Sequence, residues 1–228
     1  MRIAGMAKTS LIDYPGLVSC VLFMPGCNFD CFYCHNRTLV DGPFEVLEPE
    51  LVEAFLRKRT GQLDGVVMTG GEPTLQPDLL PYLAWVRSFG YKIKLDTNGS
   101  SPRMVESLLH AGVCDFWAVD WKAPVSRYAE IGGPGANPAH VLETIRLLLS
   151  AGADFEVRTT VVPQLCLEDL LIMAKELPVL PRYVLNRYRP PEVFKPRDAE
   201  RVWVQPYNQF EIDAFADAVR FVQPNTVR

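Results

Sequence analysis

Three cysteines close to the N-terminus have a spacing that suits an iron–sulfur cluster. Cys27, Cys31 and Cys34 follow the pattern C-x3-C-x2-C, and no fourth cysteine lies nearby. Each iron of a cubane [4Fe–4S] cluster needs a ligand, so three thiolates hold three irons and leave the fourth open. An open iron can bind a substrate or a cofactor directly. The spacing therefore favours a cluster that takes part in chemistry over one that only transfers electrons.

Other cysteine chemistries explain the pattern less completely. A thioredoxin-type redox pair would use Cys31 and Cys34 and leave Cys27 without a role. A structural zinc site needs a fourth ligand, and His35 directly follows Cys34, where it is poorly placed to bind the same ion. A two-cluster ferredoxin sequence would need a further cysteine followed by proline, which is absent. The remaining cysteines stand singly among apolar neighbours, which favours buried positions; they are Cys20, Cys114 and Cys166.

A second pattern ends a short apolar segment downstream. Residues 66–69 are followed by Gly70, Gly71, Glu72 and Pro73. Glycines at the end of a strand let the backbone approach a ligand closely. On its own this tetrapeptide would be an ordinary turn. At the end of the strand that follows a three-cysteine loop, it indicates a second part of the same site.

Charged residues occur where further strands end. Asp96 and Thr97 begin an Asp-Thr-Asn-Gly sequence, which a turn alone could explain. Asp120 and Lys122 stand two residues apart, on one side of an extended chain, and the alternative there is a weak local ion pair. Arg158 lies within a predicted strand and needs a partner. Together these charges suit a small zwitterion, whose ammonium pairs with carboxylates and whose carboxylate pairs with cations.

Six strand-like segments alternate with helical patterns and must position these residues. We predict strands at 17–23, 65–68, 91–95, 115–119, 155–162 and 183–188, and helices at 79–89, 102–111, 140–151 and 209–222. Such alternation implies a parallel sheet with right-handed crossovers. The cysteines then follow the first of these strands, at the end where α/β proteins place their chemistry. Periodicity alone does not distinguish an open sheet from a partial barrel.

Size and charge exclude other classes of protein. The chain has 228 residues, which suits a single domain over 1–228, and its net charge of −4 gives no electrostatic case for nucleic acid. No segment approaches the ~20 apolar residues of a membrane span, and no signal peptide is visible. We therefore expect a cytoplasmic protein that binds neither nucleic acid nor membrane.

These motifs resemble the radical S-adenosylmethionine superfamily, whose signature C-x3-C-x-aromatic-C has Tyr33 as its aromatic residue here. The resemblance implies that the three cysteines hold a [4Fe–4S] cluster and that S-adenosylmethionine binds the open iron. It also implies that Gly70, Gly71 and Glu72 contact the methionyl ammonium. The implied fold is an incomplete (β/α)6 barrel, a partial TIM-type barrel of parallel strands, with its core at about 15–190 and a C-terminal helix.

Glycyl-radical activating enzymes share the Asp-Thr-Asn-Gly and Asp-x-Lys sequences in this order. By that resemblance, Asp96 and Asp120 would contact the ribose and ammonium of the cofactor, or a monovalent cation beside its carboxylate. Lys122 would bind the carboxylate itself. The match is weaker elsewhere; the further cofactor contacts implied are Thr97, Arg158 and Asn186, the last by position alone.

Two segments are similar to those of the anaerobic ribonucleoside-triphosphate reductase activating proteins, which are related to pyruvate formate-lyase activating enzyme. They are residues 8–16, with the sequence Lys-Thr-Ser-Leu-Ile-Asp-Tyr-Pro-Gly, and the later Cys-His-Asn. This implies an oxidoreductase of anaerobic metabolism. It would reductively cleave S-adenosylmethionine and abstract a hydrogen from a glycine of a partner enzyme, foremost anaerobic ribonucleotide reductase, with a flavodoxin or ferredoxin-type electron donor. The alternative is a small-molecule enzyme similar to 7-carboxy-7-deazaguanine synthase, with a largely enclosed pocket.

Two loops carry further expectations. The Gly-Gly-Pro-Gly sequence at 132–135 lacks the ending of a phosphate-binding loop, and we expect a mobile loop or lid. Residues 182–201 follow the last predicted strand and are rich in cations, which suits docking to an acidic partner surface, although a solvated loop would look the same. These cations are Arg182, Arg187, Arg189, Lys195, Arg197 and Arg201.

Overall fold

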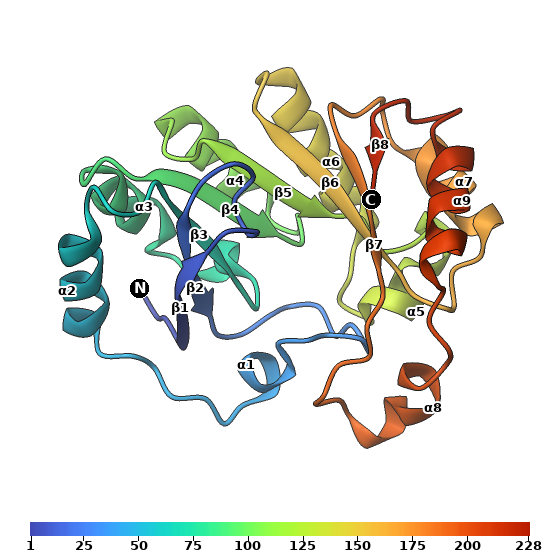
Figure 1. Cartoon of the computed structure of the whole chain (residues 1–228), viewed down its shortest axis with the longest axis horizontal. Helices are drawn as coiled ribbons and strands as arrows, with labels where there is room; N and C mark the ends of the chain where they lie inside the picture. The colour runs from blue at the N-terminus through green and yellow to red at the C-terminus, as the bar shows by residue number, and fades with distance from the viewer.

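The chain folds around one curved sheet of eight strands that does not close into a full barrel (Figure 1). The computed structural model describes residues 1–228. Strand β1 is antiparallel to β2, and all later neighbours are parallel and follow the order of the chain. The strands are β1 (Gly5–Ser10), β2 (Ser19–Met24), β3 (Gly65–Gly70), β4 (Lys92–Thr97), β5 (Phe116–Asp120), β6 (Phe155–Val161), β7 (Tyr183–Arg187) and β8 (Thr226–Val227).

The predicted incomplete parallel barrel is confirmed, and the six predicted strands are β2 to β7. The sheet has two additional strands, β1 and the short β8, at its two edges. Because β1 and β8 do not pair with each other, the barrel keeps an open side between them. None of the helices combines the length and the apolar character needed to cross a membrane.

Helices fill the connections between the parallel strands. They are α1 (Arg37–Asp41), α2 (Pro49–Arg59), α3 (Leu79–Arg87), α4 (Pro102–Ala111), α5 (Tyr128–Gly132), α6 (Pro138–Ser150), α7 (Leu167–Glu176), α8 (Ala199–Val202) and α9 (Gln209–Val219). The predicted start and stop of α4 are confirmed: Pro102 opens its first turn, and Gly112 follows it in the left-handed conformation with φ of 61°. The final helix begins at Gln209 as predicted but ends at Val219, before the predicted position.

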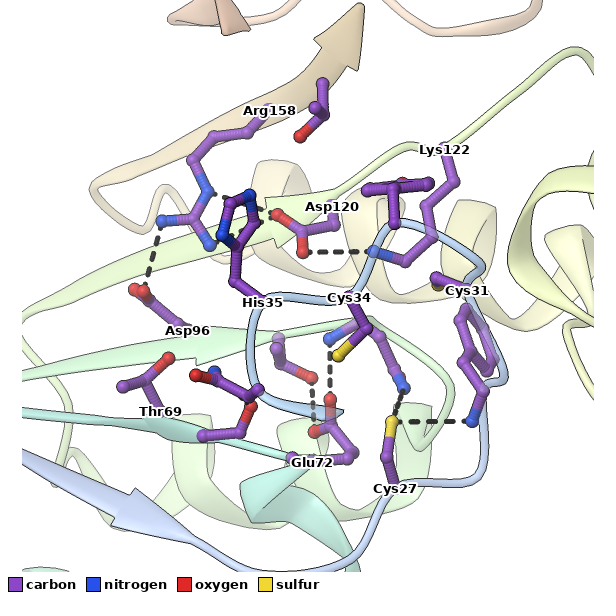
Figure 2. A pocket seen from close by; sticks show the side chains of 18 residues that line it. Cys27, Cys31, Cys34, His35, Thr69, Glu72, Asp96, Asp120, Lys122 and Arg158 are labelled. Atoms are coloured by element: carbon purple, nitrogen blue, oxygen red, sulfur yellow. Dashed lines mark hydrogen bonds and ion pairs between the residues drawn. The ribbon is translucent and has the colours of Figure 1, made fainter. Parts of the chain in front are cut away.

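One face of the parallel strands is polar and faces the barrel interior. Side chains alternate between the two faces of a strand. Thr69 of β3, Asp96 of β4, Asp120 of β5 and Arg158 of β6 therefore share the interior face, and all four line one pocket (Figure 2). Charges from successive strands meet there for this reason.

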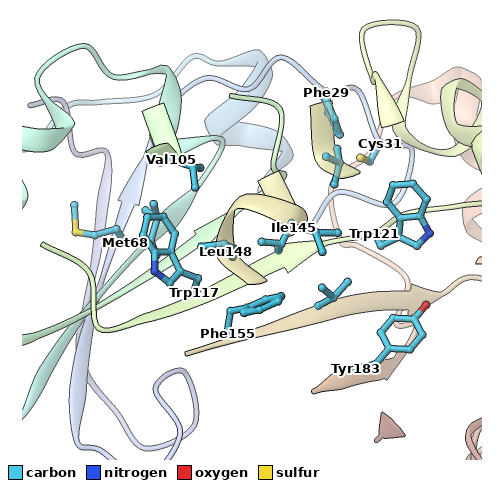
Figure 3. Close-up of a cluster of buried hydrophobic side chains, with 14 of the residues drawn as sticks. Phe29, Cys31, Met68, Val105, Trp117, Trp121, Ile145, Leu148, Phe155 and Tyr183 are labelled. Carbon is cyan, nitrogen blue, oxygen red and sulfur yellow. The ribbon is translucent and has the colours of Figure 1, made fainter. Parts of the chain in front are cut away.

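The opposite face is apolar and lies against the helices. Met68, Trp117 and Phe155 of the strands belong to one buried cluster with Val105 of α4 and Leu148 of α6 (Figure 3). Burial of each such side chain contributes about 1.5–3 kcal/mol. This packing holds the strands in place, and it thereby fixes the positions of the polar residues on their other face.

Candidate cluster and cofactor site

A pocket of about 240 Å³ lies at the carboxyl ends of the parallel strands. The cysteine loop forms one side of it, and charged residues of the strands form the other (Figure 2). Every predicted site residue except Asn186 lines this pocket: Cys27, Cys31, Tyr33, Cys34, Gly70, Gly71, Glu72, Asp96, Thr97, Asp120, Lys122 and Arg158. Six further residues line the pocket without having been predicted, although each lies within or next to a motif or two residues along a strand from one; they are Phe29, His35, Asn36, Thr69, Asn98 and Thr160.

The three cysteines lie on the loop that follows β2, and none forms a disulfide. Burial raises the pKa of the Cys27 thiol to about 12, and the Glu72 carboxylate acts in the same direction. Burial also raises the pKa of Cys31. Such thiols are poor free nucleophiles, but a bound metal displaces their protons. The loop therefore suits metal coordination better than redox chemistry of a free thiolate.

The donor set fits a [4Fe–4S] cluster with an open iron. No three His, Cys, Asp or Glu side chains converge on the position of one metal ion. A cubane does not need such convergence, because each thiolate binds a different iron. Three free thiols that line one pocket supply ligands for three irons.

Asp30 anchors the cysteine loop to a distant part of the chain. Its carboxylate accepts hydrogen bonds from Arg37 at 2.7 Å, from Lys195 at 2.8 Å and from Arg197 at 2.8 Å. Burial alone would raise the pKa of Asp30, but Lys195 and Arg37 lower it below its ordinary value. Arg37 is itself buried and also donates to the carbonyl of Cys31. The segment before α8 thus holds the loop between its first two cysteines.

The two glycines that end β3 are required by the close approach of the β2 end. A Cβ atom on Gly71 would lie 1.8 Å from the carbonyl oxygen of Gly26, and one on Gly70 would lie 2.4 Å from the Met24 nitrogen. The Gly71 amide donates to the Met24 carbonyl at 2.7 Å, and the Glu72 amide donates to the Gly26 carbonyl at 2.8 Å. The Gly-Gly pair therefore joins the start of the cysteine loop to the end of β3.

Glu72 is fully buried, and both of its carboxylate oxygens are occupied. One accepts from the Thr74 amide and from the hydroxyls of Thr74 and Thr97, and the other accepts from the Asn98 amide at 2.6 Å. Burial nevertheless raises the pKa of Glu72. Asn98 in turn donates to Cys27 Sγ at 3.7 Å. Glu72 thus positions the end of β4 against the cysteine loop, and both of its oxygens already accept hydrogen bonds from the chain.

Five charged side chains form an alternating network across β4, β5 and β6, in the order Lys94, Asp96, Arg158, Asp120, Lys122. Lys94 donates to Asp96 at 2.6 Å, Arg158 donates to Asp96 at 3.0 Å and to Asp120 at 3.1 Å, and Lys122 donates to Asp120 at 3.2 Å. Burial would raise the pKa of Asp120, but Lys122 and Arg158 lower it. Burial would lower the pKa of Lys122, but Asp120 raises it. The pair of Asp120 and Lys122 is therefore part of a larger network and not an isolated surface ion pair.

Asn186 and Cys166 differ from their predicted places. Asn186 is exposed and lines a second hollow, because β7 borders the open side of the barrel. A cofactor contact at Asn186 is thus not supported by its position. Cys166 is exposed and not buried, because it occupies the N-cap position of α7, at the surface end of that helix. Cys20 is fully buried, as predicted.

The glycine-rich loop at 132–135 packs against the cysteine loop in this structure, and its predicted mobility stays a prediction. The Gly132 carbonyl accepts from the Asp30 amide at 2.9 Å and lies 3.8 Å from Cys31 Sγ. A Cβ atom on Gly133 would lie 2.8 Å from the Asp30 backbone. These glycines allow the close contact that supports the cysteine loop.

Most cations of the 182–201 segment have partners within the chain. Arg182 pairs with Glu156, and Lys195 and Arg197 pair with Asp30. The Arg201 guanidinium lies 4.0 Å from the centre of the Phe32 ring. Arg187 and Arg189 are exposed, and their side chains form no ion pair. A docking role of the segment would therefore depend chiefly on these two arginines. The backbone at Arg189 is held by His35, which donates to the Arg189 carbonyl at 3.0 Å.

Comparisons with known proteins show the family to which the chain belongs. A sequence profile of the radical SAM superfamily matches residues 21–177. The chain is 31% identical over 201 residues to a Methanocaldococcus jannaschii protein with the provisional name of glycyl-radical enzyme activating enzyme, covering 84% of this chain and 82% of that protein. It is 29% identical over 189 residues to 7-carboxy-7-deazaguanine synthase of Thermococcus kodakarensis, covering 74% and 73%.

The fold also matches a solved structure. Streptococcus suis SuiB bound to S-adenosylmethionine superimposes with a TM-score of 0.67 at 16% identity, over 91% of this chain and 51% of that one. The similarity at this identity concerns the fold, and this chain spans about half of that protein. With its three-cysteine loop, its partial barrel and the matching profile, the chain belongs to the radical S-adenosylmethionine superfamily, which implies a [4Fe–4S] cluster and S-adenosylmethionine as its cofactors.

Proposed function

We propose that this protein activates a glycyl-radical enzyme, foremost an anaerobic ribonucleoside-triphosphate reductase. The observation that carries the proposal is the open side of the barrel next to the cofactor pocket. A second hollow is lined by Ile12 and Pro15, which precede β2, and by Val184 and Asn186 of β7. It shares Arg158 with the cofactor pocket. A loop of a large partner protein could enter by this route. The similarity to the M. jannaschii protein also supports the activation of a glycyl-radical enzyme.

The chain's own residues would bind and orient the cofactors. The three cysteines would hold the cluster, and Lys122 and Arg158, which line the same pocket, would pair with the carboxylate of S-adenosylmethionine. Gly70 and Gly71 would offer backbone groups to its ammonium. When bound, the two cofactors supply reductive cleavage of the sulfonium, for which a flavodoxin or ferredoxin-type protein would provide the electron. No acid or base from the protein is required for that cleavage.

The cofactor contacts can be tested by binding. Lys122→Ala and Asp96→Ala should weaken S-adenosylmethionine binding to the cluster-loaded protein by roughly ten- to over a hundredfold, the value of a buried charge-assisted hydrogen bond. Iron content should be unchanged, because neither residue lies on the cysteine loop. Calorimetry that finds full affinity in both variants would refute this assignment.

The partner can be tested by electron paramagnetic resonance. The reduced, cluster-loaded protein should generate a glycyl-radical signal when mixed with S-adenosylmethionine and an anaerobic ribonucleotide reductase, whereas the Cys34→Ala variant should not. Charge reversal of Arg187 and Arg189 to Glu should slow formation of the signal, while reversal of the exposed Arg146 on α6 should have no effect. Cofactor cleavage without partner should be the same in all three charge variants. Equal activation rates in all of them would remove the docking role.

A second candidate is a small-molecule enzyme of the 7-carboxy-7-deazaguanine synthase type, favoured by the 29% identity to the Thermococcus kodakarensis enzyme. Such an enzyme would enclose its substrate, whereas here a second hollow adjoins the cofactor pocket, and the sheet does not close between β1 and β8. Formation of 7-carboxy-7-deazaguanine without a glycyl-radical signal would favour this alternative.

A further inference from the structure

We infer that this chain needs no monovalent cation beside its cofactor, because the ammonium of Lys94 takes the place of that ion. The resemblance to glycyl-radical activating enzymes implies a cation at Asp96 and Asp120, beside the cofactor carboxylate. The residues present do not fit such an ion. The inference rests on the proposed binding of S-adenosylmethionine in the pocket.

The carboxylate oxygens that would bind the ion already have cationic partners. Asp96 Oδ1 lies 2.6 Å from Lys94 Nζ, and Oδ2 lies 3.0 Å from Arg158. Asp120 Oδ1 lies 3.1 Å from Arg158, and Oδ2 lies 3.2 Å from Lys122. A potassium or sodium ion gives up its hydration shell only for several oxygens that replace the water. Here each of the four oxygens faces an ammonium or a guanidinium.

The charge balance argues in the same direction. Three cations and two carboxylates give the network a net charge of +1. A further cation would raise it to +2 within a partly desolvated site, where like charges a few ångströms apart repel strongly. A single positive charge instead matches the one carboxylate of a bound methionyl group.

Lys94 is placed for this role by the strand alternation. It lies two residues before Asp96 on the same face of β4, its side chain is 3% exposed, and its ammonium donates to Asp96 alone. Lys92 lies two residues earlier on the same face, but it is exposed and pairs with Asp115. Lys94 is therefore a positioning residue for the carboxylate of Asp96, which would bind the cofactor. Lys92 provides a matched control on the same strand.

The test measures the affinity of the cluster-loaded protein for S-adenosylmethionine by anaerobic calorimetry. The buffers contain potassium or the bulky tetramethylammonium ion at equal ionic strength. The wild-type affinity should differ between the two salts by less than about twofold, less than the loss of a single hydrogen bond would produce. Lys94→Met should bind roughly ten- to a hundredfold more weakly in tetramethylammonium. Potassium should restore much of that loss, because the variant frees one Asp96 oxygen and removes one charge. Lys92→Met should behave as the wild type.

A wild-type protein that requires potassium would overturn the inference, and this comparison does not depend on the folding of any variant. Lys94→Met that binds normally in both salts, or weakly in both, would also overturn it, since a merely structural lysine would not be replaced by an ion. A wild-type protein that binds no S-adenosylmethionine in either salt would overturn the proposed cofactor site, and the inference with it.

Discussion

Removal of the Asp30 carboxylate should loosen the cysteine loop more than its place at the surface suggests. Asp30→Ala deprives three cations of a partner at once. The bond to Arg37 is worth the most, about 1.5–3 kcal/mol, because the Arg37 side chain is only 4% exposed. The bond to Lys195 is partly exposed and contributes about 0.5–1 kcal/mol, and the bond to the exposed Arg197 contributes about 0–0.5 kcal/mol. We therefore expect a loss of about 2–4.5 kcal/mol.

Two measurements check this value. Urea denaturation of the cluster-free protein, followed by tryptophan fluorescence, should show a midpoint lower by roughly 1 M at a typical slope. The loaded variant should also lose its cluster faster to a chelator, because the loop carries the cysteines. Asp41→Ala is the matched control: Asp41 faces the same cations at 3.4 Å and 3.6 Å and is more exposed, so its loss should cost less than about 1 kcal/mol. Equal midpoints for the two variants would refute the role of Asp30 as an anchor.

Three further predictions follow from the structure. Alanine at any of the three loop cysteines should abolish the [4Fe–4S] absorbance after reconstitution, whereas Cys166→Ala should preserve it, because Cys166 lies at the start of α7. Asp115→Asn should destabilise the protein by about 1–3 kcal/mol at neutral pH. Burial would raise the pKa of Asp115, but Lys92, the Ile93 amide and Arg87 lower it. Its contribution is therefore complete above the ordinary pKa of about 4 and is lost as the pH falls through the lower folded value, so the difference from wild type in chemical denaturation should shrink towards about pH 3. Gly71→Ala should cost at least about 2 kcal/mol in the same assay, because its Cβ would overlap the Gly26 carbonyl, whereas Gly5→Ala, with ordinary contacts at 3.6 Å, should cost less than about 1 kcal/mol.

The sequence predicted the parallel strands because each is either an apolar run, as in β2 and β3, or an alternation of apolar and polar residues, as in β4 and β6. Strand β1 has no such run: its residues are half-buried or exposed, and it is held by pairing with β2. Strand β8 has only two residues and pairs with β7. Both depend on contacts between distant segments, which the pattern of a single segment does not contain.

Site residues were predictable where a motif fixed both their type and their place. Glu72 and Asp96 reach the pocket for this reason, and Asn186, placed by strand position alone, does not. Lys94 was missed because a lysine between apolar residues of a strand usually faces solvent, whereas here that face is the barrel interior. Asp30 was missed because its partners lie 165 and 167 residues away.

The distance along the chain between Asp30 and its partners also sets an order of events during synthesis. The ribosome delivers the cysteine loop early, but Lys195 emerges 165 residues later than Asp30. Gly132, whose carbonyl accepts a hydrogen bond from the Asp30 amide, also emerges well after the loop. Until then the cysteine loop has its contacts with Glu72 and Asn98 but lacks those that Gly132 and Lys195 make with Asp30. The loop therefore reaches its fully anchored form only after Lys195 has been synthesised, and we expect stable binding of the cluster from that point on.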